Sequence, residues 1–440
     1  MLGDTPSTGY LISQYPSRSH TFILREIQEI ERLGLPVKVA SINQPDRAMD
    51  AMMPDEQQEA ARTHYIKSQG AAGALRALVQ EFKANPVGVL KGLAGAIRLG
   101  RSHPKTLLIH LAYYAEAVMV ACWMRRNQLR HLHVHFAQAV CTVGMLTKLI
   151  NGCQYSFTVH GPDEFSNVEH HRLREKFAMA DRIIAITYYA QSQIMLHANS
   201  EDWGKILIVR VGLDCEPFLM LAAERIKHHA ARGVPEILSI GRLSPAKGQL
   251  VLLKALASLK LKNVSFHLTL VGTGPLHALL ENEAKRLGLD DRHLTFAGGK
   301  NQDEIHALIR ESDLFALSSF AEGLPVVLME ALLAELPVVT TTITGIPELI
   351  QHEREGLLVA AGDSEGFAEA LQHCLTHTAE AQAMAQSGQK RVLELHDIHV
   401  TGRQLYRCFT ELANRDSEIF GPSQAGVEAL HAPIVSLAKP

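Results

Sequence analysis

Ser318-Ser-Phe-Ala-Glu-Gly-Leu-Pro-Val-Val-Leu-Met-Glu330 connects an apolar run that ends at Leu317 with a segment of helical pattern. We expect the helix to begin at Leu324 and Pro325, because a proline in the first helical position gives up an N–H that has no partner inside the helix. The turn at Glu322 and Gly323 then presents backbone N–H groups at a helix N-terminus, an arrangement that binds phosphate or diphosphate. Glu330 follows about two helical turns after Glu322 and is placed to accept hydrogen bonds from sugar hydroxyls. The alternative is structural: Glu322 caps the helix and Glu330 is a solvated surface acid.

Length and composition favour a soluble α/β protein of two domains. A chain of 440 residues is too long for one core and suits two domains of about 200 residues each. The net charge of −3 gives no overall attraction to nucleic acid. Six scattered cysteines without a CxxC pair are typical of a reducing compartment. We see no signal peptide and no run of 18 apolar residues, so we expect a cytoplasmic protein without a membrane-spanning segment.

The first half of the chain begins with a strand–helix–strand pattern. Residues 10–13 and 37–42 read as strands, and residues 22–33 between them read as a helix. This order is typical of a parallel sheet with covering helices. We therefore expect a first Rossmann-like domain at residues 1–217.

Residues 71–130 combine a helical pattern with an excess of basic side chains. Only Glu81 and Glu116 are acidic in this region, against nine cations. The cations are Arg76, Lys83, Lys91, Arg98, Arg101, Lys105, Arg125, Arg126 and Arg130. One interpretation is a solvated basic face on ordinary core helices. The other is a basic amphipathic surface that docks on anionic lipid headgroups.

Histidines mark the ends of two expected strands in this first domain. His131, His133 and His135 alternate along one strand and so share a face. A zinc site is one interpretation, but no carboxylate partner is evident, and packing or delivery of one or two imidazoles to a cleft is favoured. His160 follows the strand at residues 155–159, and ligands of open α/β sheets bind at such strand ends. His160 is therefore a site candidate, with an ordinary turn histidine as the alternative.

The second half repeats the strand–helix rhythm after a charged segment at residues 218–234, which we interpret as the interdomain linker. A strand at residues 236–240 leads into a loop that carries Arg242 and Lys247. Arginine offers a fork to two oxygens and lysine a point charge, so the pair suits a diphosphate. We expect the second domain at residues 235–390, returning helices at 391–420 and a poorly ordered tail at 421–440.

Four motifs in the second half together resemble the C-terminal domain of the retaining glycosyltransferases of family 4. They are Gly241-Arg-Leu with Lys247-Gly, Val271-Gly-Thr-Gly-Pro275, Glu322-Gly-Leu-Pro325 with Glu330, and Thr344-Gly-Ile-Pro-Glu348 with Gly356-Leu-Leu-Val359. Looser matches in the first half are similar to the branch that builds bacterial exopolysaccharides such as colanic acid. The resemblance covers about residues 8–415. It implies the GT-B fold: two Rossmann-like, doubly wound α/β domains that face each other across a cleft, with a C-terminal helix returning to the first domain.

The resemblance also implies roles for particular residues. Four would be catalytic: His160, Arg242, Lys247 and Glu322. The donor would contact Gly241, Arg242, Lys247, Gly272, Gly274, Gly298, Glu322, Gly323, Leu324, Pro325, Val326 and Glu330, with Glu330 on the ribose hydroxyls. The acceptor side would include Ser17, Arg18, Ser19 and His135. No metal or other cofactor is expected. The chain departs from the family where residues 14–19 lack the glycine-rich loop of many relatives, and where His20 replaces a glutamate, so the acceptor stays open.

The implied activity is transfer of a sugar from a UDP- or GDP-sugar, with retention, to a saccharide or polyprenyl-linked oligosaccharide. The product would belong to bacterial exopolysaccharide or another cell-surface glycan. No carboxylate stands out as a nucleophile for the far face of the sugar, so front-face attack is expected. Two alternatives stay open. One is a nucleotide-sugar epimerase on the same architecture, and the other is a non-catalytic subunit that binds sugar nucleotides.

Overall fold

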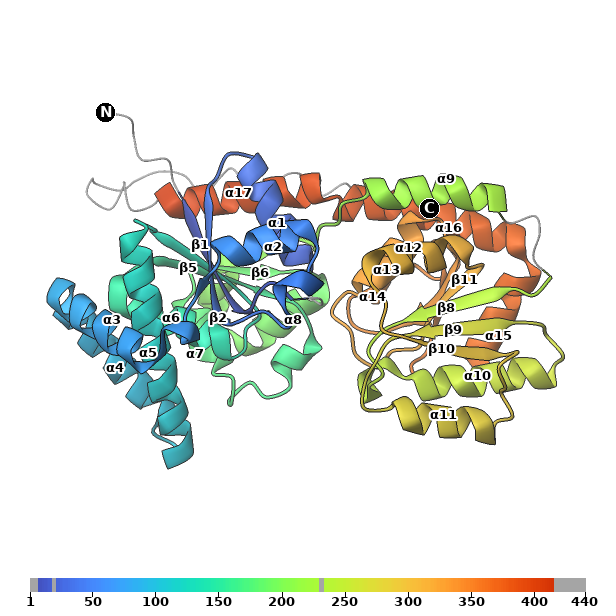
Figure 1. The fold of residues 1–440 in the computed structure, drawn as a ribbon, viewed down its shortest axis with the longest axis horizontal. Coiled ribbons are helices and arrows are strands. Elements are labelled where there is room, and N and C mark those ends of the chain that lie inside the picture. The colour runs from blue at the N-terminus through green and yellow to red at the C-terminus, as the bar shows by residue number, and fades with distance from the viewer. Residues whose placement is uncertain (1–6, 18–20, 229–232, 415–440) are drawn as a thin grey trace.

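Two parallel β-sheets, one in each half of the chain, organise the computed structural model, which describes residues 7–17, 21–228 and 233–414. The first sheet has seven strands in the order β3-β2-β1-β4-β5-β6-β7. The second has six strands in the order β10-β9-β8-β11-β12-β13, and every strand pair in both sheets is parallel. Figure 1 shows the two sheets side by side, each with helices on both faces.

The strands of the first sheet are β1 (Thr8–Gln14), β2 (Val37–Asn43), β3 (His64–Tyr65), β4 (His131–His135), β5 (Gln154–Val159), β6 (Arg182–Ala185) and β7 (Ile206–Ile208). Its helices are α1 (Thr21–Arg32), α2 (Pro54–Arg62), α3 (Gly70–Ala84), α4 (Pro86–Gly100), α5 (Pro104–Arg126), α6 (Ala139–Asn151), α7 (Leu173–Met179) and α8 (Tyr188–His197).

The strands of the second sheet are β8 (Glu236–Ile240), β9 (His267–Val271), β10 (Leu294–Gly298), β11 (Leu314–Leu317), β12 (Val338–Thr341) and β13 (Leu357–Val359). The helices of this half are α9 (Glu216–His228), α10 (Gln249–Leu261), α11 (His277–Arg286), α12 (Gln302–Glu311), α13 (Val326–Leu333), α14 (Ile346–Leu349), α15 (Ser364–Thr376), α16 (Thr378–His396) and α17 (Ile398–Asn414).

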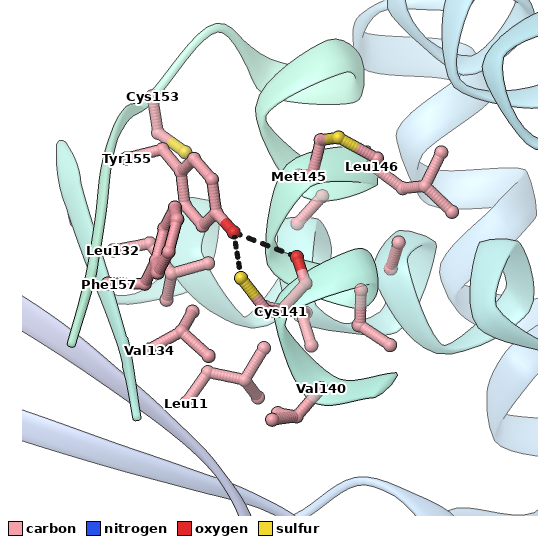
Figure 2. Packing of buried hydrophobic residues seen from close by; sticks show 14 of the residues in the cluster. Leu11, Leu132, Val134, Val140, Cys141, Met145, Leu146, Cys153, Tyr155 and Phe157 are labelled. Atoms are coloured by element: carbon pink, nitrogen blue, oxygen red, sulfur yellow. Dashed lines mark hydrogen bonds between the residues drawn. The ribbon is translucent and has the colours of Figure 1, made fainter. Parts of the chain in front are cut away.

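Buried apolar side chains on both faces of each sheet form the cores, as continuous apolar strands of parallel sheets require. Figure 2 shows the part of the first core between β4, β5 and α6. There the Tyr155 hydroxyl donates to the Cys141 carbonyl at 2.8 Å, so a buried polar group finds a partner. All six cysteines are buried and free, as small core residues.

The predicted linker at residues 218–234 differs from the structure, because its first part lies in α9, which packs against the second domain. Phe218 and Leu221 of α9 belong to a core cluster of that domain. The buried guanidinium of Arg225 donates to the carbonyls of Ile309 at 2.8 Å and of Ser312. The chain therefore crosses between the sheets earlier, between β7 and α9.

A second crossing follows α16, after which α17 packs against α1 and β4 of the first domain (Figure 1). Phe409 of α17 lies with its ring 4.7 Å from that of His133. The two crossings are bound to each other: the Leu213 N–H donates to His396 O at 2.7 Å, and the Ile398 N–H donates to Leu213 O at 2.9 Å. The expected return of the C-terminal helix is confirmed for the described residues; the predicted tail at 421–440 lies outside them.

Candidate functional site

The loops that follow β8 and β11 interlock and form the floor of the candidate donor site. Gly248 has a φ of +62°, and a Cβ there would collide with the Ser318 carbonyl. The Ser318 hydroxyl donates to Gly248 O at 3.0 Å, and the Phe320 N–H donates to Ala246 O at 2.7 Å. The two loops carry Arg242 and Lys247 on one side and Glu322 on the other. They approach closely because glycine permits both the backbone conformation and the contact.

Lys247 and Glu322, both predicted donor-site residues, form an ion pair. Nζ of Lys247 lies 2.5 Å from Oε1 of Glu322, and the Ser319 hydroxyl donates to the same oxygen at 2.6 Å. The backbone carbonyl of Glu322 accepts from the Thr344 hydroxyl. An anionic ligand near Lys247 would compete with Glu322 for the ammonium group.

Arg242 is exposed, and the described residues provide no hydrogen bond or ion pair for its guanidinium. Its carbonyl accepts from the Gln249 side chain at 2.9 Å, which fixes the loop rather than the charged group. The guanidinium is therefore available for a ligand.

The helix that follows these loops, α13, begins at Val326, with Pro325 as its N-cap residue. The expectation that Pro325 stands in the first helical position was wrong, because its ψ of 119° is extended. Leu324 and Pro325 are buried, so the N-terminus of α13 is held against the domain core.

Glu330 lies on the buried face of α13 and is 8% exposed, which excludes the solvated surface acid considered above. Burial raises the pKa of its carboxyl to about 7, and a hydrogen bond from Gln302 lowers it only in part. The unliganded protein therefore holds a carboxyl group poised between its two protonation states near neutral pH.

The predicted glycines surround the same loops. Gly272 follows β9, and its N–H donates at 2.8 Å to the carbonyl of Gly298, which ends β10. Gly274 packs against Leu243, and the Gly241 N–H donates to Val271 O at 3.0 Å. These contacts align the ends of β8, β9 and β10.

His160 lies at the end of β5, where its backbone carbonyl contacts the second domain. A Cβ on Gly323 would collide with the His160 carbonyl, so the turn before α13 touches the first domain at this point. Side chains pack around the imidazole, with ring centroids at 5.1 Å for Phe22 and 4.5 Å for Phe136. The structure thus brings the backbone of His160 and the loop of Glu322 together where the two domains meet.

A buried chain of polar groups extends from His160 into the first domain. Nε2 of His160 lies 3.0 Å from Nδ1 of His135, and Nε2 of His135 lies 3.2 Å from Oε1 of Glu26. The latter two atoms are close but not aligned for a hydrogen bond. Glu26 also accepts from the Tyr10 hydroxyl at 2.7 Å. His135 was predicted on the acceptor side, but it is fully buried behind His160 and can act on a ligand only through that residue.

Ligand atoms of Glu26, His133 and His135 lie within 4.8 Å of one another, close enough for a metal ion to bridge them. His133, however, uses Nδ1 with the Ser156 hydroxyl at 2.8 Å and Nε2 with that of Thr158 at 3.0 Å. Both nitrogens are engaged, and burial holds the pKa of His133 well below its usual value. His133 is therefore a core histidine whose two ring nitrogens both have hydrogen-bond partners, and it is not placed to act as a zinc ligand.

Of the other acceptor-side candidates, Ser17 is buried and its hydroxyl donates to Asp46 at 3.0 Å. Arg18 and Ser19 lie outside the described residues.

Two carboxylates that support the site were missed by sequence reasoning. Glu348 accepts the N–H groups of Tyr188 and Tyr189 at 2.9 Å each and pairs with Arg210 at 3.1 Å, which connects α14 of the second domain to the N-terminus of α8 in the first. Glu348 ends the motif of residues 344–348, yet nothing in the sequence indicates partners about 140 to 160 positions away.

The second missed carboxylate, Glu164, is buried and fixes the turn at His160. It accepts the N–H of His160 at 2.5 Å and that of Gly161 at 3.0 Å, as well as that of Ala137. Burial raises the pKa of Glu164 to about 7, while these three N–H groups oppose the shift. An acid four residues after a strand-end histidine is the signal that could have identified it.

Several known proteins are similar to this chain in sequence or in fold. Residues 222–391 match the family model of the glycosyl transferases group 1. The chain is 27% identical over 417 residues to the amylovoran biosynthesis glycosyltransferase AmsK of Erwinia amylovora, covering 92% of this chain and 99% of AmsK. It is 27% identical over 377 residues to the putative colanic acid biosynthesis glycosyltransferase WcaL of Escherichia coli, covering 82% of this chain and 89% of WcaL.

Among solved structures, HepE of Anabaena in complex with UDP superposes with a TM-score of 0.68 at 18% identity, covering 92% of this chain and all of that chain. Sucrose-phosphate synthase of Thermosynechococcus elongatus superposes with a TM-score of 0.69 at 16% identity, covering 92% of this chain and 99% of that chain. These likenesses confirm the predicted fold of two facing α/β domains.

Proposed function

We propose that this chain, which contains a group 1 glycosyltransferase domain and has the GT-B fold, transfers a sugar from a nucleotide-sugar to a hydroxyl group with retention of configuration. The observation that carries the proposal is the interlocked pair of loops after β8 and β11. They bring the cations Arg242 and Lys247, the acid Glu322 and the N-terminus of α13 to one edge of the second sheet. Ligands of open α/β sheets bind at that edge.

The ion pair between Lys247 and Glu322 supports a mechanism in which the donor exchanges partners with the protein. The diphosphate would take the Lys247 ammonium from Glu322 and also bind the guanidinium of Arg242, which has no partner among the described residues. The Glu322 carboxylate, released from Lys247, would then accept hydrogen bonds from the donor sugar. Positive charge at the diphosphate stabilises the negative charge that grows as the sugar leaves.

In the proposed transfer, the acceptor hydroxyl attacks the anomeric carbon on the face from which the phosphate departs. The new bond joins the acceptor oxygen to that carbon, the bond between the carbon and the phosphate oxygen breaks, and the acceptor proton passes to the departing phosphate. His160 would lie beside the donor sugar, and Glu330 would accept the ribose hydroxyls. Two cations and a helix N-terminus can supply the electrostatic stabilisation, so we propose that no metal ion is needed, and that EDTA leaves turnover unchanged.

The named activities of similar proteins support a substrate class. AmsK and WcaL carry names of exopolysaccharide biosynthesis, and HepE was crystallised with UDP and with UDP-glucose. We therefore propose a UDP- or GDP-sugar as donor and a growing bacterial exopolysaccharide, as free saccharide or polyprenyl-linked oligosaccharide, as acceptor. The reaction would take place in the cytoplasm.

The test is a thermal-shift panel of UDP-, GDP- and ADP-sugars, since a ligand that binds the folded state raises its stability. We expect one nucleotide class to stabilise the wild type, and Arg242→Ala to lose most of that shift. The matched control is Arg292→Ala, an exposed arginine at the other end of the second sheet. No shift with any sugar nucleotide would refute the proposal.

Incubation of the stabilising donor with and without saccharide acceptors then separates the alternatives. Transfer with the anomeric configuration kept supports the proposal. Epimerised donor in the absence of acceptor would support an epimerase, and binding without transfer or hydrolysis would support a non-catalytic subunit.

A further inference from the structure

Three helices of the first domain expose an unusual number of large apolar side chains. Figure 1 shows α3, α4 and α5 at the side of the first sheet that is remote from the second domain. Eight of the nineteen exposed large hydrophobic residues of the described chain lie on them. They are Leu75, Val79, Phe82, Val87, Leu90, Ile97, Leu108 and Ile109. Most are about half exposed, and Leu108 reaches 71%.

On α3 the exposed apolar side chains form one continuous face. Leu75, Val79 and Phe82 are spaced by four and three residues, so they lie above one another on one side of the helix. The opposite side of α3 carries the buried Ala77 and Glu81, and Glu81 accepts two hydrogen bonds from Arg125 of α5 at 3.0 and 2.6 Å. The apolar face therefore points away from the domain.

The exposed charged groups on α3, α4 and the first half of α5 are all cations. Six exposed basic residues accompany the apolar ones: Arg76, Lys83, Lys91, Arg98, Arg101 and Lys105. None of the six forms an ion pair with a described residue. The only acids of the region are Glu81, which is buried, and Glu116, which lies 3.5 Å from Lys67. The surface thus combines apolar side chains with cations that lack a counter-ion in the described chain.

A hollow of about 630 Å³ at the end of α4 adds a converging set of arginines. Arg98, Arg101 and Arg172 line it, together with Leu99, Ser102 and Glu175. Arg172 donates to Leu99 O at 2.6 Å, which fixes its position, while its Nε is buried without a partner in the described chain. Three guanidinium groups against one carboxylate favour an anion such as a phosphate.

We propose that the outer faces of α3 and α4 and the first half of α5 form a docking surface for the headgroup region of an anionic lipid bilayer. The apolar side chains would enter the boundary with the acyl chains, the six cations would meet the lipid phosphates, and the arginine hollow would hold one headgroup. Charge complementarity selects this partner, because helices with basic and apolar side chains on one exposed face lie in such an interface.

The helices lie on the membrane rather than across it. By length and composition α5 is the one described helix that could span a bilayer, but its residues 117–124 are buried in the domain core. Only its first half, with Leu108 and Ile109, is free to contact lipid.

Docking would also fix the orientation of the enzyme relative to the bilayer, a consequence for catalysis that rests on the proposed function. Arg172 of the hollow immediately precedes α7, and the segment 160–172 connects it to His160 at the end of β5. A surface-bound enzyme would thus hold its first domain, and with it His160, in one fixed orientation relative to the bilayer.

The test is co-sedimentation of the full chain with phosphatidylcholine vesicles that contain or lack phosphatidylglycerol. Each cation near an anionic surface contributes about fivefold in affinity. We therefore expect Arg98→Gln with Arg101→Gln to weaken binding roughly 25-fold. The matched control is Arg403→Gln with Arg407→Gln, two exposed cations four residues apart on α17. Circular dichroism of each variant checks that the fold is kept.

A second variant, Leu75→Gln with Phe82→Gln, tests the apolar face. We expect it to lose the part of vesicle binding that survives high salt, because salt screens the cations but not the apolar contact. Equal binding to neutral and anionic vesicles, or undiminished binding of the arginine variant, would overturn the proposal. So would a dimer in vesicle-free solution that the Leu75 and Phe82 substitutions dissociate, since a second copy of the chain would then cover this face. Donor binding by the thermal-shift assay should be unchanged in all variants, which separates this proposal from the proposed function.

Discussion

Replacement of Glu330 by glutamine should stabilise the unliganded protein at alkaline pH. Burial raises the pKa of this carboxyl to about 7 in the folded chain, against an ordinary value of 4.5 for glutamate. Between these two values the folded state binds more protons at this group than the unfolded state does. The free energy of unfolding therefore falls as the pH rises, and the stability contribution is fully present below pH 4.5 and lost above the folded pKa.

The size of the effect follows from the two pKa values. One pKa unit corresponds to about 1.4 kcal/mol, so the wild type should lose about 2–3 kcal/mol between roughly pH 5 and pH 8 through this one group. Glutamine keeps the shape and cannot ionise, so Glu330→Gln should escape this loss. For a domain of this size the difference corresponds to roughly 5–10 °C in the midpoint of thermal unfolding at pH 8.

Thermal unfolding of the wild type and of Glu330→Gln over this pH range measures the difference. Glu369→Gln is the matched control, because it makes the same chemical change at an exposed position of α15 in the same domain. Equal pH dependence of the wild type and Glu330→Gln would refute the reasoning about burial.

The same carboxyl links pH to donor binding if it accepts the ribose hydroxyls. Only the ionised form accepts both, so the affinity of the wild type for its sugar nucleotide should rise up to about 100-fold from pH 5 to pH 8. Glu330→Gln should bind more weakly at pH 8 and show little pH dependence.

Three further predictions concern the two loops and the contact between the domains. Lys247→Ala should lower kcat by about 10²–10³-fold, because it removes positive charge at the departing phosphate, and steady-state release of the nucleotide measures this. Gly323→Ala should lower kcat at least about tenfold without unfolding either domain, because the added Cβ would collide with the His160 carbonyl and displace the loop. Single-turnover assays measure the effect. The control is Gly299→Ala, where an added Cβ would contact only one methyl group at 3.5 Å. Glu348→Gln replaces charge-assisted hydrogen bonds by neutral ones and should weaken the contact between the domains by about 1 kcal/mol, which small-angle scattering detects as a larger radius of gyration without ligand.

The strands could be predicted because buried parallel strands carry continuous apolar runs, as at Leu314–Leu317. The edge strand β3 was missed, since two residues give no periodic pattern. The start of α13 was placed one to two residues too early, because the sequence does not show that Pro325 has an extended ψ.

The local parts of the site were also accessible from the sequence, whereas its long-range contacts were not. Arg242 and Lys247 occur together in one loop, so their proximity follows from spacing alone. The pairing of Lys247 with Glu322 joins positions 75 residues apart and depends on how the loops after β8 and β11 meet. The burial of Glu330 had a signal that was overlooked: α13 is apolar on all sides apart from this residue, which is typical of a helix enclosed by its domain.

The two crossings between the domains determine how the cleft can open. Because Leu213 is hydrogen-bonded to both His396 and Ile398, the crossings cannot move independently of each other. Rotation about their common line is compatible with these bonds, whereas sliding of one domain along the other would break them. The cleft should therefore open by a hinge motion about the two crossings. The donor would then enter, and the nucleotide product leave, on the side of the cleft opposite to the crossings.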